Sequence, residues 1–264
     1  MIIIDSRSCI GCSACIKDCP TKALRLNQEG KAEPIRNCIQ CGHCVAICPE
    51  NAVSIPEYDM NEVEAYDEKS FSVNPENFLN AVKFRRSIRN FSPKPLSRET
   101  LSGILNAGRY TATAKNQQDC RFVLVQEHFE EFKELFWNEL PAMLEKTDLK
   151  NHPYYRALQL LYKQHLHNPS DDPFFFNGSA FLVISSDRAL DAGLAAANIE
   201  NMAAANGAGA LYCGYLQQII NRSPILKNWL DLGDAPVACC MLLGYPNVTY
   251  RRTAPRKKAD ILWK

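Results

Sequence analysis

Eight of the twelve cysteines lie within the first 48 residues, in two runs of identical spacing, C-x-x-C-x-x-C-x-x-x-C-P. In such a run, three closely spaced thiolates bind one iron–sulfur cubane, and the fourth thiolate binds the cubane of the other run. We therefore assign each cluster three ligands from one run and one from the other. The first [4Fe-4S] cluster is assigned to Cys9, Cys12, Cys15 and Cys48, and the second to Cys38, Cys41, Cys44 and Cys19.

Structural zinc and disulfides are weaker interpretations of these cysteines. A structural zinc ion takes two C-x-x-C knuckles, which leaves the third cysteine of each run without a role. A disulfide framework requires a secreted chain. The apolar start, Met1 to Ile4, is too short for a signal peptide and is followed by Asp5. Two [4Fe-4S] clusters are the expected use.

The repeat extends beyond the cysteines. Ile10 recurs as Ile39 and Ala23 as Ala52, each 29 positions later, which indicates a duplicated unit with a short strand after each Cys-Pro. Up to about Pro56 the chain resembles a bacterial two-cluster ferredoxin. A segment this small buries little core, so its folding is expected to depend on metal–thiolate bonds.

The length of 264 residues suits one small cofactor-held domain and one ordinary domain. We expect a ferredoxin domain over residues 1–56, an acidic linker over 57–74 and a second domain over 75–264. The net charge of +1 gives no reason to expect a nucleic-acid or membrane partner. The longest apolar run, Val237 to Leu243, is too short to span a bilayer. A cytoplasmic location is expected.

The elements that must position a site in the second domain begin with a helix capped by Asn74, with Pro75 in its first turn. A second helix is expected after Ser97, and Pro141 and Pro153 are expected to break a long helical segment. Other elements follow from hydrophobic periodicity: a helix over 191–206 and strands over 121–126, 179–186, 210–213 and 237–244. Irregular alternation of helices and strands predicts an α+β sandwich with a mixed sheet.

The segment from Arg85 to Phe91, R-R-S-I-R-N-F, places three guanidinium groups and a hydroxyl directly after a helix. Arginine presents planar forks of donors that match phosphate oxygens, and a serine hydroxyl adds a compact donor. The segment is therefore a candidate phosphate site. A basic surface cluster explains the three arginines equally well.

Residues 85–91 also resemble the opening motif of the nitroreductase-like FMN oxidoreductases. Further segments match that family in order: 112–118, 191–198, 207–214, 244–246 and 255–258. The chain departs from the family pattern at Asp119, where proline is usual, and at Cys120, where an aromatic residue is common. The resemblance covers most of the second domain, and it implies FMN as cofactor and a homodimer with the flavin at the interface.

The resemblance also implies roles for individual residues. Arg85 and Ser87 are expected at the FMN phosphate together with Arg256 and Lys258, with Arg86 beside the ribityl chain. Arg89 is expected at the pyrimidine edge of the flavin, where a fixed cation stabilises the reduced form. Residues expected to contact the partner's flavin are Ala112, Thr113, Ala114 and Asn116, and Gln118 belongs to the same loop. Residues expected to cover the ring or to offer it backbone amides are Leu211, Tyr212, Cys213 and Gly214.

The expected chemistry is a redox relay in which the clusters exchange single electrons with the flavin. No side chain is required as a nucleophile or an essential base. The acceptor would be a flat, electron-poor small molecule such as a nitroaromatic or a quinone. NAD(P)H and a redox protein are the candidate donors, and without a G-x-G-x-x-G turn a nicotinamide would stack on the flavin face. The competing interpretations are reduction of an enone or a halogenated ring, and a non-catalytic electron carrier.

Four other reactive residues receive no chemical role. Cys239 and Cys240 fall within an apolar strand and are expected to be buried core residues. His165 and His167 have no companion at metal-ligand spacing and are expected to face solvent.

Overall fold

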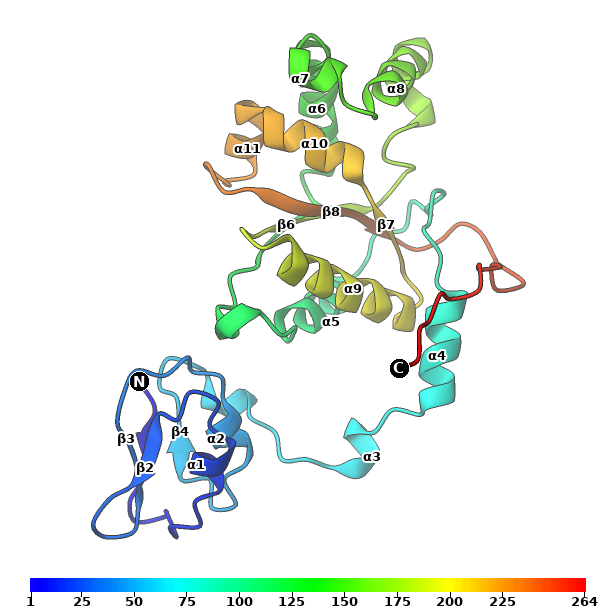
Figure 1. Ribbon diagram of the computed structural model, residues 1–264. Coiled ribbons are helices and arrows are strands. Elements are labelled where there is room, and N and C mark those ends of the chain that lie inside the picture. Colours follow the sequence, from blue (N-terminus) through cyan, green and yellow to red (C-terminus); the bar gives the residue numbers. More distant parts are fainter. The chain divides into compact units, whose positions relative to one another are not determined.

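The computed structural model describes the whole chain, residues 1–264, which forms two compact units (Figure 1). The first unit contains Met1–Ser72 together with Thr113–Gln118, and the second contains Val73–Ala112 and Asp119–Lys264. None of the helices has the length and apolar character needed to cross a bilayer.

The first unit contains two small antiparallel sheets and several short helices. Strand β1 (Ile3–Ile4) pairs with β4 (Val53–Ser54), and β2 (Leu24–Leu26) pairs with β3 (Ala32–Pro34). The short helices are α1 (Ala14–Asp18), α2 (His43–Ala46), η1 (Met60–Glu62) and α3 (Glu68–Phe71). Strands β2 and β4 follow the two Cys-Pro pairs, as the repeat predicted.

The duplication is also visible in the backbone. Helix α2 begins 29 residues after α1, and residues with positive φ recur at the same interval. The matching pairs are Gly11 (72°) with Gln40 (50°), Ser13 (62°) with Gly42 (76°), and Lys22 (53°) with Asn51 (50°). Left-handed backbone is costly for residues other than glycine. Its recurrence therefore indicates that both halves fold their cysteine loops in the same way.

Gly11 is the position in these loops least able to accept a side chain. A Cβ atom there would lie 2.3 Å from the carbonyl oxygen of Gly30, and the residue has a φ of +72°. Gly11→Ala is therefore expected to displace the first cysteine loop and to cost about half of the bound iron, because only one of two clusters depends on this loop. Iron analysis after anaerobic purification measures the loss.

Gly42→Ser provides the matched control for this substitution. Nothing lies within 4 Å of a Cβ atom at Gly42, and its counterpart, Ser13, carries a side chain at a similar φ. Gly42→Ser should retain nearly all of its iron. Equal iron in the two variants would contradict the steric argument.

The second unit is built on a four-stranded sheet in the order β5-β6-β8-β7. Its strands are β5 (Arg121–Val125), β6 (Ala180–Ser185), β7 (Gly209–Tyr212) and β8 (Val237–Gly244). All three strand pairings are antiparallel. The parallel component is a single isolated bridge between Ser87 and Ala210. The predicted α+β fold is confirmed, and the mixed character of the sheet is limited to this bridge.

Helices cover both faces of the sheet (Figure 1). Helices α5 (Arg98–Arg109) and α9 (Ala189–Ala205) lie against one face, and α6 (Phe129–Leu144), α10 (Gly214–Arg222) and α11 (Pro224–Trp229) against the other. The remaining helices are α4 (Pro75–Phe84), η2 (Ala114–Asn116), α7 (Thr147–Lys150), α8 (Tyr155–His167) and η3 (Pro169–Asp171).

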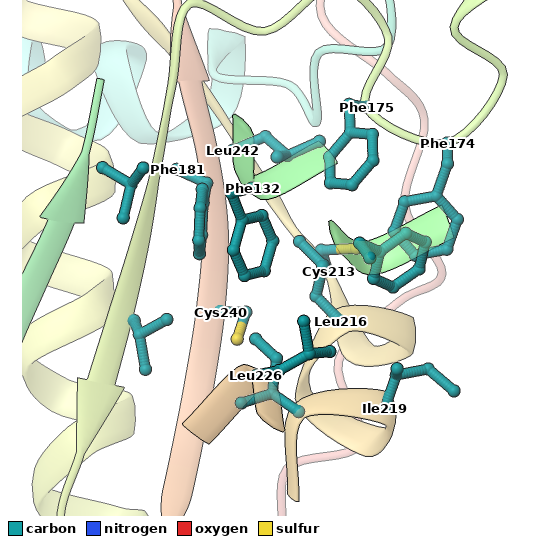
Figure 2. Packing of buried hydrophobic residues seen from close by; sticks show 14 of the residues in the cluster. Phe132, Phe174, Phe175, Phe181, Cys213, Leu216, Ile219, Leu226, Cys240 and Leu242 are labelled. Atoms are coloured by element: carbon teal, nitrogen blue, oxygen red, sulfur yellow. The ribbon is translucent and has the colours of Figure 1, made fainter. Parts of the chain in front are cut away.

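The alternation of side chains along β8 divides the apolar residues into two cores. Cys240 and Leu242 point into the core beneath α6 and α10, whereas Met241 and Leu243 point into the core beneath α5 and α9. Figure 2 shows the first of these cores, where Phe132 and Phe181 pack with ring centroids 4.3 Å apart. This double burial explains why the strand is apolar at nearly every position.

One expected helix break is wrong. Helix α6 continues through Pro141 to Leu144, although proline removes a hydrogen bond from a helix. Phe136 and Leu140, in the turn that precedes Pro141, are fully buried, and their packing maintains the helix. Pro153 does fall between α7 and α8, as predicted.

Candidate cofactor sites

The structure brings together the four cysteines assigned to the first cluster. Cys9, Cys12 and Cys15 line one cavity with Cys48, whose position in the sequence belongs to the second run. The surface of this cavity is almost entirely apolar. An apolar pocket lined by four cysteines suits an iron–sulfur cubane.

Backbone amides donate hydrogen bonds to cysteine sulfur atoms in both halves of the unit. The amide of Ala23 donates to Cys19 Sγ and that of Ala52 to Cys48 Sγ, each at 3.3 Å. The amide of Gln40 donates to Cys38 Sγ at 3.1 Å. Such donors stabilise thiolates and cluster sulfur, and they influence the reduction potential of a cluster.

The electrostatics of the thiols also fit a cationic occupant. Burial raises the pKa of Cys15, and the nearby Cys12, Cys48 and Cys9 raise it further. Burial raises the pKa of Cys44 to about 11, with a further contribution from the neighbouring Cys38 and Cys41. Thiolates packed this closely repel one another. Iron cations would offset that repulsion, so the donor set fits the group that the spacing predicted.

A polar pair links the helices that carry the cysteine runs. His43 Nδ1 lies 3.0 Å from Asp18 Oδ2, which joins the first residue of α2 to the last residue of α1. His43 therefore has an ordered partner between the two cysteine runs.

In the second unit, five residues expected at the flavin line one cavity, which we call the Arg89 cavity. This cavity is partly open to solvent. The five expected residues are Arg89, Leu211, Tyr212, Cys213 and Gly214. The cavity is completed by Tyr154, Leu161, Pro173, Phe174, Phe176 and Tyr215. The aromatic members of this second group were missed in the sequence, although the run Phe174 to Phe176 was a visible signal.

One role expected in this cavity is wrong. The backbone amide of Cys213 donates to the carbonyl of Cys240 at 2.8 Å, so it is committed to the sheet. The thiol is buried in the core (Figure 2), and burial raises its pKa to about 12. Gly214 begins α10, where an amide has no partner within the helix. Of the two amides, only that of Gly214 is placed to bind a ligand.

Gly214 also allows close packing at this cavity. A Cβ atom there would lie 3.1 Å from Tyr154 Oη and 3.3 Å from the ring edge of the same tyrosine. The Tyr154 ring packs in turn against Tyr215, with centroids 4.6 Å apart. Tyr154, the residue before α8, and Tyr215 on α10 thus form an aromatic wall beside the glycine.

Arg85 and Arg86 lie together in a second depression, which we call the Arg85 groove. It lies between α4, the C-terminal half of α9 and the start of β7. Gly207 and Gly209 lie along the groove and belong to the matching segment 207–214, which we call the glycine-rich turn. The guanidinium of Arg86 lies 5.7 Å from the centroid of the Tyr250 ring.

The Arg85 guanidinium has a partner that the sequence did not reveal. Its Nη1 atom donates to Glu200 Oε1 at 2.6 Å, and the Glu200 side chain is only 8% exposed. Close by, Ser87 bridges to Ala210, and the amide of Ile88 donates to the Ala210 carbonyl at 3.1 Å. The arginine motif is therefore attached to β7 by its backbone and to α9 by an ion pair.

The remaining expected residues lie elsewhere. Residues 113–118 belong to the first unit, where Asn116 Nδ2 donates to the Gln40 carbonyl at 2.9 Å and Gln118 Nε2 donates to Tyr58 Oη at 2.9 Å. Arg256 and Lys258 are exposed and line neither the Arg85 groove nor the Arg89 cavity. A single chain thus brings together only some of the residues expected at the flavin.

The residues without an assigned role are placed mostly as expected. Cys240 is buried, Cys239 is half-buried, and His167 faces solvent. The expectation for His165 is wrong, because its ring stacks on Trp137 with centroids 3.9 Å apart and its Nδ1 atom is buried.

Two known families match different parts of the chain. The model described as "Nitroreductase family" matches residues 82–245, and that described as "4Fe-4S dicluster domain" matches residues 1–49. No curated protein matches the chain.

Solved structures with the same fold as the second unit include several nitroreductases. The nitroreductase with bound FMN from Bacteroides fragilis is 19% identical, with 72% of this chain and 100% of that chain covered and a TM-score of 0.57. The nitroreductase with bound FMN from Desulfitobacterium hafniense is 20% identical, with coverage of 72% and 100% and a TM-score of 0.56. The FMN-dependent nitroreductase from Clostridium difficile is 16% identical, with coverage of 71% and 100% and a TM-score of 0.51.

Proposed function

The chain belongs to the nitroreductase family, and from this premise we propose that it is an FMN-dependent oxidoreductase whose two [4Fe-4S] clusters exchange electrons with the flavin. The proposal rests on two cavities, one lined by the predicted cluster cysteines and one lined by residues expected at the flavin. Four cysteines from both runs line one cavity, and Arg89 lines another with Leu211 and Gly214.

The residues present fit FMN. Arg85, Arg86 and Ser87 lie together beside the glycine-rich turn, and arginine forks suit a phosphate group. Arg89 supplies a cation to the Arg89 cavity, where it would stabilise negative charge on a ring. The Gly214 amide would donate to a ring acceptor. Bound FMN would couple one-electron donors to two-electron acceptors, which no side chain can do.

The proposal includes a homodimer that completes the site. Large apolar side chains remain exposed on α4 and α9, including Phe78, Leu79, Leu194 and Met202. Exposed apolar patches of this kind suit an interface between subunits. In the dimer, Ala112, Thr113, Ala114 and Asn116 would contact the partner's flavin, and Arg256 and Lys258 would reach a phosphate.

The aromatic lining of the Arg89 cavity supports a flat acceptor. Tyr154, Phe176 and Tyr215 line this cavity, and aromatic rings of this kind can stack on a planar molecule. We therefore propose that nitroaromatics and quinones are the substrates, and that the protein takes its electrons from NAD(P)H or from a redox protein.

Anaerobic purification of the full chain tests the proposal. We expect about one FMN and about eight iron atoms per chain, since each cubane holds four irons. Reduction of nitroaromatics should exceed reduction of enones in a steady-state screen. Iron without flavin would identify an electron carrier, and turnover of enones alone would assign a different acceptor.

A further inference from the structure

Glu200 is a buried carboxylate beside the proposed phosphate site. It lies on the face of α9 that packs toward the sheet, among Ala196, Ile199 and Ala203. A buried ionised carboxylate is strongly unfavourable unless charged or hydrogen-bonding groups compensate it. The Arg85 guanidinium, whose Nη1 atom lies 2.6 Å from Glu200 Oε1, provides this compensation.

A second group from another element lies near the same carboxylate. Tyr212 is the last residue of β7, and the charge of Glu200 acts on its phenol. Burial raises the pKa of Tyr212, and the charge of Glu200 raises that pKa further. The phenol therefore stays protonated beside the carboxylate.

Glu200 lies near residues of both cavities. Arg85 and Glu200 line the Arg85 groove, and Tyr212 lines the Arg89 cavity. The carboxylate thus lies beside the proposed phosphate end of the site and close to the proposed ring end.

The bond to Glu200 leaves Arg85 with capacity for a second anion. A guanidinium carries five N–H donors in a rigid fork, and the Arg85 side chain remains 25% exposed. Fixing a long side chain before the ligand arrives lowers the entropy lost on binding. For stability alone, an apolar pair of similar volume would serve as well as a buried ion pair.

We propose that Glu200 is a positioning residue that holds the Arg85 guanidinium so that its remaining N–H groups bind the FMN phosphate. This inference rests on the proposed function, because it concerns how the chain binds that cofactor.

The test is a double-mutant cycle on FMN affinity, measured by anaerobic calorimetry on the full chain, with its clusters intact and its flavin removed. Glu200→Gln keeps the volume of the side chain but removes its charge, so the Kd for FMN should rise about tenfold. Arg85→Met should raise the Kd by more than Glu200→Gln does. Adding Glu200→Gln to Arg85→Met should change nothing further, because the only route from Glu200 to the phosphate is then absent.

Two further variants complete the design. Asp148→Asn removes the carboxylate of another ion pair, in which Asp148 Oδ2 lies 2.6 Å from Arg222 Nε. Neither residue lines either cavity, so this variant should leave the Kd unchanged. Glu200→Asp keeps the charge but shortens the side chain, so it should also weaken binding. If Glu200→Gln does not fold, Glu200→Asp provides the test in its place.

An unchanged or lower Kd in Glu200→Gln would overturn the inference, and so would an equal effect with and without Arg85. A wild-type chain that binds no FMN would instead refute the proposed function. The two failures are therefore distinguishable.

Discussion

Replacing Cys48 with alanine is expected to remove the cluster of the first cysteine run, although Cys48 belongs to the second. Cys48 shares its cavity with Cys9, Cys12 and Cys15, and an alanine there leaves three thiolates for one cubane. The variant should retain about four of about eight irons. Iron analysis and low-temperature electron paramagnetic resonance of the reduced protein measure the remaining cluster.

Pairs of substitutions decide which cluster is lost. With crossed ligation, Cys12→Ala and Cys48→Ala affect the same cluster, so the double variant should keep the same four irons as Cys12→Ala alone. Combining Cys41→Ala with Cys48→Ala should remove nearly all iron, because those residues serve different clusters. The opposite pattern, with iron retained in the second pair and lost in the first, would show that each run binds its own cluster.

Gly209→Ala is expected to disrupt the arginine motif without any change in its charges. A Cβ atom at Gly209 would lie 2.4 Å from Ile88 Cγ1 and 3.2 Å from Pro246 Cγ. Ile88 is buried, and its amide bonds to Ala210, so the segment carrying the arginines must move away from β7. We expect a loss of about 1 to 3 kcal/mol in the free energy of unfolding from overpacking, together with loss of bound FMN.

A compensating substitution separates steric displacement from other causes. Ile88→Ala removes the atoms that clash, so Gly209→Ala combined with Ile88→Ala should recover part of the flavin binding lost in Gly209→Ala. Gly103→Ala is the matched control, because nothing lies within 4 Å of a Cβ atom there and alanine favours the α5 helix. Thermal unfolding and flavin content should be no worse than in the wild type. Retention of flavin by Gly209→Ala would refute the close-approach argument.

Features encoded within a few neighbouring residues were predictable from the chain alone. The cysteine spacing indicated two cluster-binding runs, and the 29-residue repeat extends to matching left-handed residues in both halves. Asn74 and Ser97 cap the predicted helices, with side chains that accept from the amides of Asn77 and Thr100. Capping, turn geometry and thiolate spacing are local, so the sequence specifies them without knowledge of the fold.

Features that depend on distant partners required the folded structure. Glu200 pairs with Arg85 across 115 positions, and the Cys213 amide donates to Cys240 in the neighbouring strand rather than to a ligand. Pro141 remains helical because buried neighbours hold the turn around it. Strand pairing and side-chain packing determine which groups meet and which donors remain free. Those choices arise only when remote segments come together, and no local pattern records them.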